Sequence, residues 1–297
     1  MEKQRIFIDD ILSNENMNRA YKQVIKNKGA AGIDGMECND LLSHLKVNGH
    51  QLRESIRNQS YKPMPVKRVE IPKDNGSKRK LGIPTVTDRM IQQAAAQVLT
   101  PIYERKFHTN SYGFRPGKSA QQAVLKAAEY MNEGYNWVVD IDLEKFFDTV
   151  EHDKMISILN KEIKDGKTLS LIRKFLASGV MIGEQMEETE IGTPQGGNIS
   201  PLLANILLNE LDWELESRGL RFVRYADDCI ILVRSEKAAT RVMKSVTKYI
   251  ENVLRLKVNK DKSRIGRPTE IQYLGFAFYY QFQEKKYRMK VPKKSLD

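Results

Sequence analysis

Apolar residues recur at helical spacing in several stretches of the chain. The clearest case begins at Pro201, where leucine and isoleucine return every three or four positions and predict a buried helix. Further helices are predicted on the same grounds, with Gly49 separating the second from the third. They run over residues 17–28, 40–46, 51–58, about 88–107, 119–131, 152–159 and about 236–254.

Shorter apolar runs bounded by turn residues predict strands. VKRVEI (66–71) and RKLGI (79–83) flank Asn75-Gly76, a strong hairpin signal. WVVDID (137–142), the hairpin RFVRYADDCIILV (221–233) and IQYLGFAFYY (271–280) complete the set. Helices and strands in this order predict an α+β fold in which an antiparallel sheet is covered by helices on one face.

The hairpin RFVRYADDCIILV sets Asp227 beside Asp228 between two apolar runs. Two adjacent carboxylates repel each other and resist burial, so a cation or a water-filled cleft is expected to receive them. A plain hairpin turn with a solvated Asp-Asp tip is the alternative, because aspartate is a common turn residue. The pair alone favours that alternative.

A second acidic cluster lies in VVDIDLEKFFD, residues 138–148. Alternate side chains of a strand share a face, so Asp140 and Asp142 are expected to point the same way. Two-metal phosphoryl chemistry requires carboxylates from separate strand ends around cations roughly 4 Å apart. One strand could supply Asp142 and the hairpin Asp227, while a solvated edge strand is the alternative for this segment.

Composition narrows the class of partner. The 297 residues include 49 Lys and Arg against 38 Asp and Glu, and the net charge of +11 favours a polyanion, either nucleic acid or an anionic membrane surface. No apolar run approaches the roughly 20 residues that span a bilayer, and no secretion signal is visible. The two cysteines and four histidines lack zinc-ligand spacing. We expect a cytoplasmic protein without a membrane partner.

An ordered series of motifs resembles the reverse transcriptases of group II intron maturases. YADD follows the Asp142 strand, and the series covers nearly the whole chain. Its other members are YKPMPVKRVEIPKDNGSKRKLGIPTVTDRMIQ (61–92), SYGFRPGKSAQQAV (111–124), GTPQGGNISPLLANILL (192–208) and YLGF (273–276). The resemblance implies an RNA-directed DNA polymerase with the fingers and palm of a right-hand fold, in which helices back an antiparallel palm sheet.

The resemblance also implies a division of the chain. Residues 1–35 would form an N-terminal extension, 36–130 with part of 155–200 the fingers, and 131–297 the palm. Full maturases continue into a helical thumb, and many add an endonuclease region. Because the sequence ends shortly after YLGF, we expect those regions to be absent and synthesis by this portion to be weak.

For the catalytic centre, the resemblance implies two Mg²⁺ ions held by Asp142, Asp227 and the carbonyl of Leu143. Asp228 would be an auxiliary carboxylate near the primer end, and Asp140 is the fallback for Asp142. Lys262 resembles the lysine that protonates the leaving pyrophosphate, a role that requires reach and a tunable pKa.

Other residues would bind substrate. The resemblance implies that Phe147, five positions after Asp142, rejects a ribose 2′-hydroxyl, although a core aromatic is the alternative. The residues implied to bind the nucleotide triphosphate are Lys73, Arg79 and Gln195. Those for template and primer are Tyr112, Arg115, Lys118, Tyr225, Leu274 and Gly275. Phe114 lies in the same loop as Tyr112, and for it contact with the template and packing in the core are equally plausible.

The implied partners are an intron RNA template, a DNA primer and deoxynucleoside triphosphates, with a homodimer left open. The parent protein would also bind its intron RNA to assist splicing and intron mobility. Two alternatives remain. The chain could act chiefly as an RNA-binding scaffold, or as the reverse transcriptase of a retron, a diversity-generating element or a CRISPR-associated system.

Overall fold

The computed structural model describes residues 7–72, 76, 78–183, 185–187, 191–192 and 196–292. Contacts divide the chain into two compact units. Unit 1 contains Met1–Arg105 and Phe147–Leu203, and unit 2 contains Lys106–Phe146 and Ala204–Asp297. The chain therefore passes from unit 1 to unit 2, back to unit 1 and again to unit 2.

Unit 1 is centred on helix α4 (Val86–Glu104), in which apolar side chains are buried along most of its length. The hydroxyl of Thr85 caps the helix by accepting a hydrogen bond from the backbone of Asp88 at 3.1 Å. The side chain of Asn16 connects α2 (Asn14–Asn27) to α4 by donating to the carbonyl of Ala94 at 2.9 Å. The other helices wholly within this unit include α1 (Phe7–Leu12), α7 (His152–Leu159) and α8 (Gly166–Leu176).

One helix prediction in unit 1 is wrong. Residues 40–46 and 51–58 were expected as two helices, but a single helix, α3 (Leu41–Arg57), runs through Gly49. A glycine in a helix interior costs only about 1 kcal/mol, so good helix-forming neighbours keep the helix continuous. The space around Gly49 is open, because a Cβ at this position would meet Leu45 Cβ as its nearest neighbour, at 3.9 Å.

The sheet of unit 1 contains the predicted hairpin. Strands β1 (Val66–Pro72) and β2 (Lys78–Ile83) pair antiparallel, with Ile71 opposite Arg79. The strand order is β2-β1-β4-β5, and β1 pairs parallel with β4 (Val180–Ile182). Strands β4 and β5 (Gln185–Glu187) have three residues each, too few to show an alternating pattern in sequence.

The sheet of unit 2 is antiparallel and has the order β6-β7-β3-β8. It contains β3 (Trp137–Ile141), β6 (Arg221–Tyr225), β7 (Asp228–Val233) and β8 (Arg264–Gly266). Ile141 lies opposite Cys229, and Tyr225 lies opposite Asp228. The register therefore brings the end of β3 to the β6–β7 turn.

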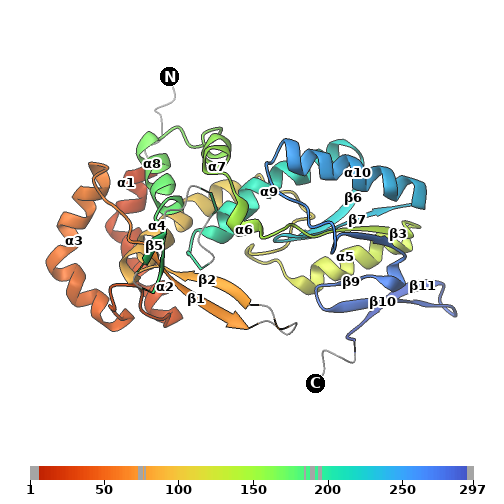
Figure 1. Ribbon diagram of the computed structural model, residues 1–297, viewed down its shortest axis with the longest axis horizontal. Coiled ribbons are helices and arrows are strands. Elements are labelled where there is room, and N and C mark those ends of the chain that lie inside the picture. The colour runs from red at the N-terminus through yellow and green to blue at the C-terminus, as the bar shows by residue number, and fades with distance from the viewer. Residues whose placement is uncertain are drawn as a thin grey trace. The chain divides into compact units, whose positions relative to one another are not determined.

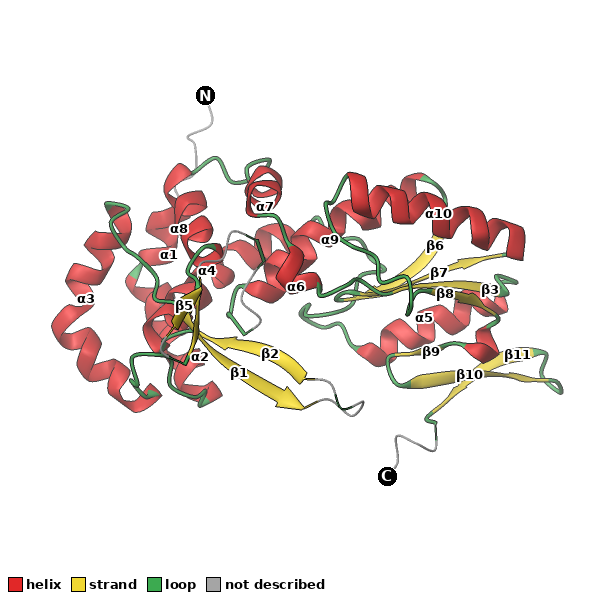
Figure 2. Cartoon of the chain, in the orientation of Figure 1, coloured by secondary structure: helices red, strands yellow, loops and turns green. Residues whose placement is uncertain are grey.

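Helices cover both faces of this sheet, which corrects the expectation of one covered face. Ile230 and Leu232 share a buried core with α5 (Ala120–Asn132). Helix α10 (Glu236–Asn252) packs against β3, β7 and β8. The two helices lie on opposite sides of the strands in Figures 1 and 2. Alternate side chains of β7 thus point toward opposite faces of the sheet, and from Cys229 to Val233 both sets are apolar.

The contacts of α5 explain a difference from the predicted division of the chain. Residues 106–130 were expected in the fingers, but they belong to unit 2, because α5 packs on β6 and on β11 (Lys286–Lys290). The strand expected over residues 271–280 is two strands, β9 (Gln272–Tyr273) and β10 (Phe276–Gln281), which form a sheet with β11. In the part of the chain that the structure describes, no helix is long and apolar enough to cross a membrane.

Candidate active site

The paired aspartates lie at a two-residue hairpin loop. Tyr225 and Asp228 form the last pair of β6 and β7, so Ala226 and Asp227 connect the strands. Ala226 adopts a left-handed conformation with φ of +56°, which costs an alanine roughly 1–2 kcal/mol. The backbone therefore forms the hairpin turn that the sequence predicted. Whether the two aspartates are only a solvated tip or part of a functional site depends on the side chains around the turn.

Asp142 directly follows β3, next to the strand that begins with Asp228. The loop before β8 holds its backbone. The amide of Asp142 donates to Ser263 Oγ at 3.1 Å, and its carbonyl accepts a hydrogen bond from the amide of Asn259 at 2.9 Å. Residues 121 positions apart in sequence thus fix the end of β3.

The carboxylates at this end of the sheet share a strongly negative environment. Burial, together with the charges of Asp227, Asp142 and Asp140, raises the pKa of Asp228 to about 6. Burial also raises the pKa of Asp140, which the Arg264 guanidinium opposes. An Asp-Asp tip in free solvent would not show these shifts, so the four carboxylates form one electrostatic cluster.

Two cations stand beside this cluster. Lys262 Nζ lies 3.9 Å from Asp142 Oδ2, and Arg264 Nε lies 3.5 Å from Asp140 Oδ2. The sequence motifs indicated Lys262, whereas Arg264 was missed because its partner lies 124 positions away. Asp140 and Asp142 thus each have a cationic neighbour, and the choice of Asp142 over Asp140 as metal ligand stays a prediction.

The remaining predicted ligand, the carbonyl of Leu143, belongs to a buried residue that forms an isolated antiparallel bridge with Val258. Among the described residues, no group of three or more His, Cys, Asp or Glu side chains is arranged to hold a metal ion. The predicted set has two carboxylates and one carbonyl, and its role remains a prediction.

Phe147 begins the second segment of unit 1, in helix α6 (Phe146–Thr149). Its neighbour Phe146 is the buried aromatic of this pair, and Phe147 is partly exposed. The role of Phe147 as a gate against ribose stays a prediction.

The residues expected to bind the triphosphate belong to unit 1. Lys73 and Gln195 lie outside the described residues, and Arg79 lies on β2 with its side chain not described. A Cβ on Gly196 would lie 2.4 Å from the carbonyl oxygen of Gly82, so the backbone that follows Gln195 contacts the strand of Arg79. Only glycine allows this approach, which explains part of the GTPQGG motif.

The structure corrects the expectation for Tyr112 in the SYGFRPGKS loop and decides between the two alternatives left open for Phe114. Tyr112 is 8% exposed and its ring belongs to the core of unit 2, so it offers no free face for stacking on a base. Phe114, for which core packing was an equal alternative, is 58% exposed, and its ring lies 6.5 Å from that of Tyr225. Of the two side chains, Phe114 is the one on the surface near the hairpin.

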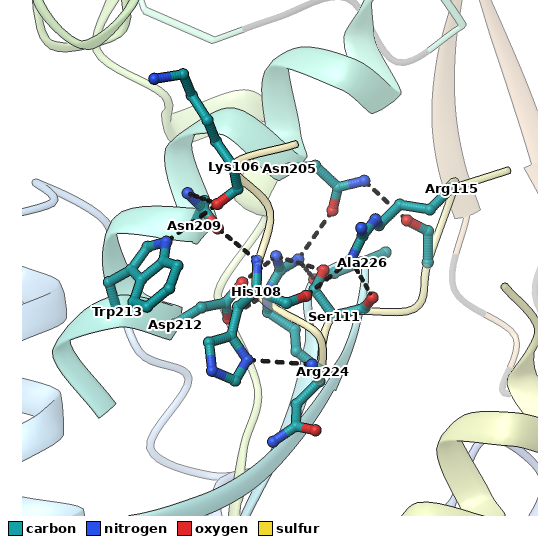
Figure 3. Close-up of polar contacts among 12 residues, drawn as sticks. Lys106, His108, Ser111, Arg115, Asn205, Asn209, Asp212, Trp213, Arg224 and Ala226 are labelled. Atoms are coloured by element: carbon teal, nitrogen blue, oxygen red, sulfur yellow. Dashed lines mark hydrogen bonds and ion pairs between the residues drawn. The ribbon is translucent and has the colours of Figure 1, made fainter. Parts of the chain in front are cut away.

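The basic residues of the same loop bind its own backbone. Arg115 donates to the carbonyls of His108 and Ser111, at 2.7 Å each (Figure 3). Lys118 donates to the carbonyl of Thr109 at 3.3 Å and lies over the ring of Tyr112. Both side chains remain partly exposed, and their contact with nucleic acid stays a prediction.

The YLGF segment forms the turn between β9 and β10. Leu274 and Gly275 both have positive φ, +51° and +79°, and Tyr273 pairs with Phe276. The hydroxyl of Tyr273 donates to the carbonyl of Val223 at 3.2 Å and lies 3.5 Å from the carbonyl of Asp228. Tyr273, which motif reasoning did not single out, thus connects this turn to the aspartate hairpin.

The chain is similar to several known proteins. The family described as reverse transcriptase (RNA-dependent DNA polymerase) matches residues 71–278. Protein YkfC of Escherichia coli K12 is 32% identical over 308 residues, which cover 90% of this chain and 80% of that protein. The group II intron-encoded protein LtrA of Lactococcus lactis is 32% identical over 324 residues, which cover 86% of this chain and 54% of LtrA.

Among solved structures, a chain of a partial Cas6-RT-Cas1–Cas2 complex is similar, with a TM-score of 0.52 and 28% identity. The match covers 84% of this chain and 43% of that one. The chain described here belongs to the reverse transcriptase family, the RNA-dependent DNA polymerases. Its similarity to LtrA confirms the group II intron maturase type that the motifs indicated, and the chain spans about half the length of LtrA.

Proposed function

We propose that this chain is the polymerase portion of a group II intron maturase and extends a DNA primer along an intron RNA template with deoxynucleoside triphosphates. One observation carries the proposal. In a member of the reverse transcriptase family, the end of β3 and the β6–β7 turn share one cluster of carboxylates that includes Asp142, Asp227 and Asp228. Splicing assistance and intron mobility are proposed for the parent protein.

The residues that would hold the catalytic cations are Asp142, Asp227 and the carbonyl of Leu143, with Asp228 as an auxiliary carboxylate. All are oxygen donors, which suits two Mg²⁺ ions. Burial and the neighbouring carboxylates together raise the pKa of Asp228, and a cluster of carboxylates of this kind is what divalent cations neutralise. Bound there, Mg²⁺ would stabilise the charge that develops during phosphoryl transfer.

Side chains of this chain would complete the reaction. The primer 3′-hydroxyl gives up its proton to solvent water as its oxygen attacks the α-phosphorus, and the bond from that phosphorus to the pyrophosphate oxygen breaks. Lys262, whose Nζ already lies 3.9 Å from Asp142, would give a proton to the leaving pyrophosphate. An ammonium group beside a carboxylate cluster also offsets negative charge when the triphosphate arrives.

Substrate recognition would use the other predicted residues. Lys73 and Arg79 would grip the triphosphate, Gln195 would pack against the nucleotide, and Phe147 would exclude the 2′-hydroxyl of a ribonucleotide. The close approach of Gly196 to Gly82 supports a shared role for the Gln195 loop and the Arg79 strand. Contacts to template and primer are proposed for Arg115, Lys118, Tyr225, Leu274 and Gly275.

Primer extension with separate measurement of RNA binding tests this function. Asp142→Asn and Asp227→Asn should each reduce extension on an RNA template to background, because each removes a charged metal ligand. Asp261→Asn, an exposed aspartate in the 259–263 loop, is the matched control and should keep activity. RNA affinity should change less than about twofold in all three variants.

The same experiment addresses the scaffold alternative. If wild-type protein binds RNA tightly but extends no primer in Mg²⁺ or Mn²⁺, the chain functions as a binding module. The similarity to a chain of a Cas6-RT-Cas1–Cas2 complex favours a second candidate, a CRISPR-associated reverse transcriptase. A clear preference for a group II intron RNA over an unrelated RNA of equal length would decide for the maturase.

A further inference from the structure

Arg224 is a fully buried charge next to the aspartate hairpin. It has no measurable exposure, and it precedes Tyr225 on β6, two residues before the turn residue Ala226. Burying a guanidinium is costly unless each of its donors is satisfied. The hydrogen bonds of Arg224 therefore show which parts of unit 2 this buried charge holds together.

All five N–H donors of Arg224 are used (Figure 3). Nε and Nη2 bind the two carboxylate oxygens of Asp212 at 2.7 and 2.6 Å. Nη2 also donates to Ser111 Oγ at 2.7 Å, and Nη1 donates to Asn205 Oδ1 at 2.9 Å. This bidentate pair with two flanking acceptors holds the guanidinium plane in one orientation.

The fifth donor binds the turn itself. Nη1 of Arg224 donates to the carbonyl of Ala226 at 2.8 Å. Ala226 has the left-handed φ of +56°, and its carbonyl precedes the amide of Asp227. A strained residue keeps such a conformation only when its surroundings determine it, and the Arg224 bond is a direct restraint on it.

The segment 110–113, in the same unit, also packs against this turn. Residues 110–112 pair with Arg224, whose amide donates to the carbonyl of Asn110 at 3.0 Å and whose carbonyl accepts from Tyr112 at 2.8 Å. A Cβ on Gly113 would lie 2.2 Å from the amide nitrogen of Ala226. Asn205 joins the two elements, because its side chain also donates to the carbonyl of Gly113 at 2.7 Å.

We propose that Arg224 is a positioning residue of the polymerase: fixed by Asp212, Asn205 and Ser111, its guanidinium holds the Ala226 carbonyl and so sets the turn through which Asp227 binds divalent metal. The inference rests on the proposed function. It also gives the SYG segment, considered from its sequence as a template contact, a role in bracing this turn.

Titration with Mn²⁺, followed by the water-proton relaxation of the bound ion, tests the proposal without requiring turnover. Arg224→Lys keeps a positive charge for Asp212 but cannot make all five bonds. It should weaken Mn²⁺ binding about tenfold or more and raise the Mg²⁺ concentration for half-maximal primer extension by a similar factor. Extension at saturating Mg²⁺ should recover toward the wild-type rate.

Arg221→Lys is the matched control, an exposed arginine on the same strand whose guanidinium lies over Tyr130 and Tyr135. It should leave Mn²⁺ affinity unchanged. Asn205→Ala provides a second variant if Arg224→Lys does not fold, because it retains the Arg224–Asp212 ion pair and loosens only the link to the turn. It should shift Mn²⁺ affinity in the same direction.

The outcomes separate this inference from the proposed function. Asp227→Asn must weaken Mn²⁺ binding if the metal site is assigned to the right residues, and no effect there would refute the proposed function. If Asp227→Asn weakens binding while a folded Arg224→Lys, or Asn205→Ala in its place, binds Mn²⁺ as wild type does, Arg224 only stabilises the fold and the positioning role is wrong.

Discussion

The ammonium nitrogen of Lys262 lies 3.9 Å from a carboxylate oxygen of Asp142, although the two residues are 120 positions apart. The contact joins the loop before β8 to the end of β3, within unit 2. Both side chains are partly exposed, so the pair contributes little to stability. Its importance is that it sets Lys262, the proposed proton donor, beside a predicted metal ligand.

We therefore expect Lys262→Gln to slow nucleotide incorporation about 100-fold, the range for loss of a general acid. Pre-steady-state incorporation of a single nucleotide would measure the effect. Lys260→Gln, at an exposed lysine in the same loop, should stay within twofold of wild type. Equal losses in both variants would mean that the loop contributes only positive charge.

The raised pKa of Asp228 predicts a pH-dependent stability. The pKa is about 6 in the folded chain and 3.8 when unperturbed, so between these values the folded state holds a proton that the unfolded state has lost. Stability from this group falls as pH rises from 3.8 to 6 and stays low above it. Without metal, Asp228→Asn should stabilise the protein at pH 8, because it removes a charge that the neighbouring carboxylates repel. The gain should be only on the order of 1 kcal/mol, because Asp228 is partly exposed and solvent screens this repulsion.

Chemical denaturation at pH 8 and at pH 4 would measure this difference, which should nearly vanish at pH 4. Saturating Mg²⁺ at pH 8 should also reduce the gap, because cations neutralise the same cluster. A constant difference across the pH range would contradict the electrostatic origin of the shift.

Gly113→Ala should destabilise unit 2, because the new methyl would lie 2.2 Å from the amide nitrogen of Ala226. Overpacking of this kind costs typically 1–3 kcal/mol, measurable as a shift of the urea midpoint. Gly166→Ala is the control, since nothing lies within 4 Å of its Cβ. If Gly113→Ala unfolds at the wild-type midpoint, the turn is less closely held than its contacts indicate.

Tyr273→Phe removes a hydroxyl that donates to the carbonyl of Val223 and lies near that of Asp228. Tyr273 is 3% exposed, so the loss leaves a buried acceptor with one partner fewer and should cost about 1 kcal/mol of unfolding free energy. Tyr279→Phe, at a tyrosine that is 37% exposed, should change stability by less than about 0.5 kcal/mol. An equal effect at both positions would argue against the role given to the buried hydroxyl.

Local pattern was a good guide to most of the secondary structure. The predicted helix over residues 152–159 has those bounds in the structure, and β1 and β2 pair antiparallel as expected, while Asn75 of the predicted turn lies outside the described residues. The pattern failed where an element was too short to show a period, as in β4, β5 and β8. It also failed at Gly49, where a local stop signal was overridden by the rest of the helix.

The sequence by itself determined the hairpin with its two aspartates, the strand before Asp142 and the family, because each depends on residues close together in the chain. Only the tertiary structure decided that Arg264 pairs with Asp140 and that helices cover both faces of the sheet. It also decided that Arg224 binds Asp212 and Ser111 and donates to the carbonyl of Ala226. Those contacts join segments up to 124 positions apart, and sheet register and helix packing, which have no local signature, bring them together.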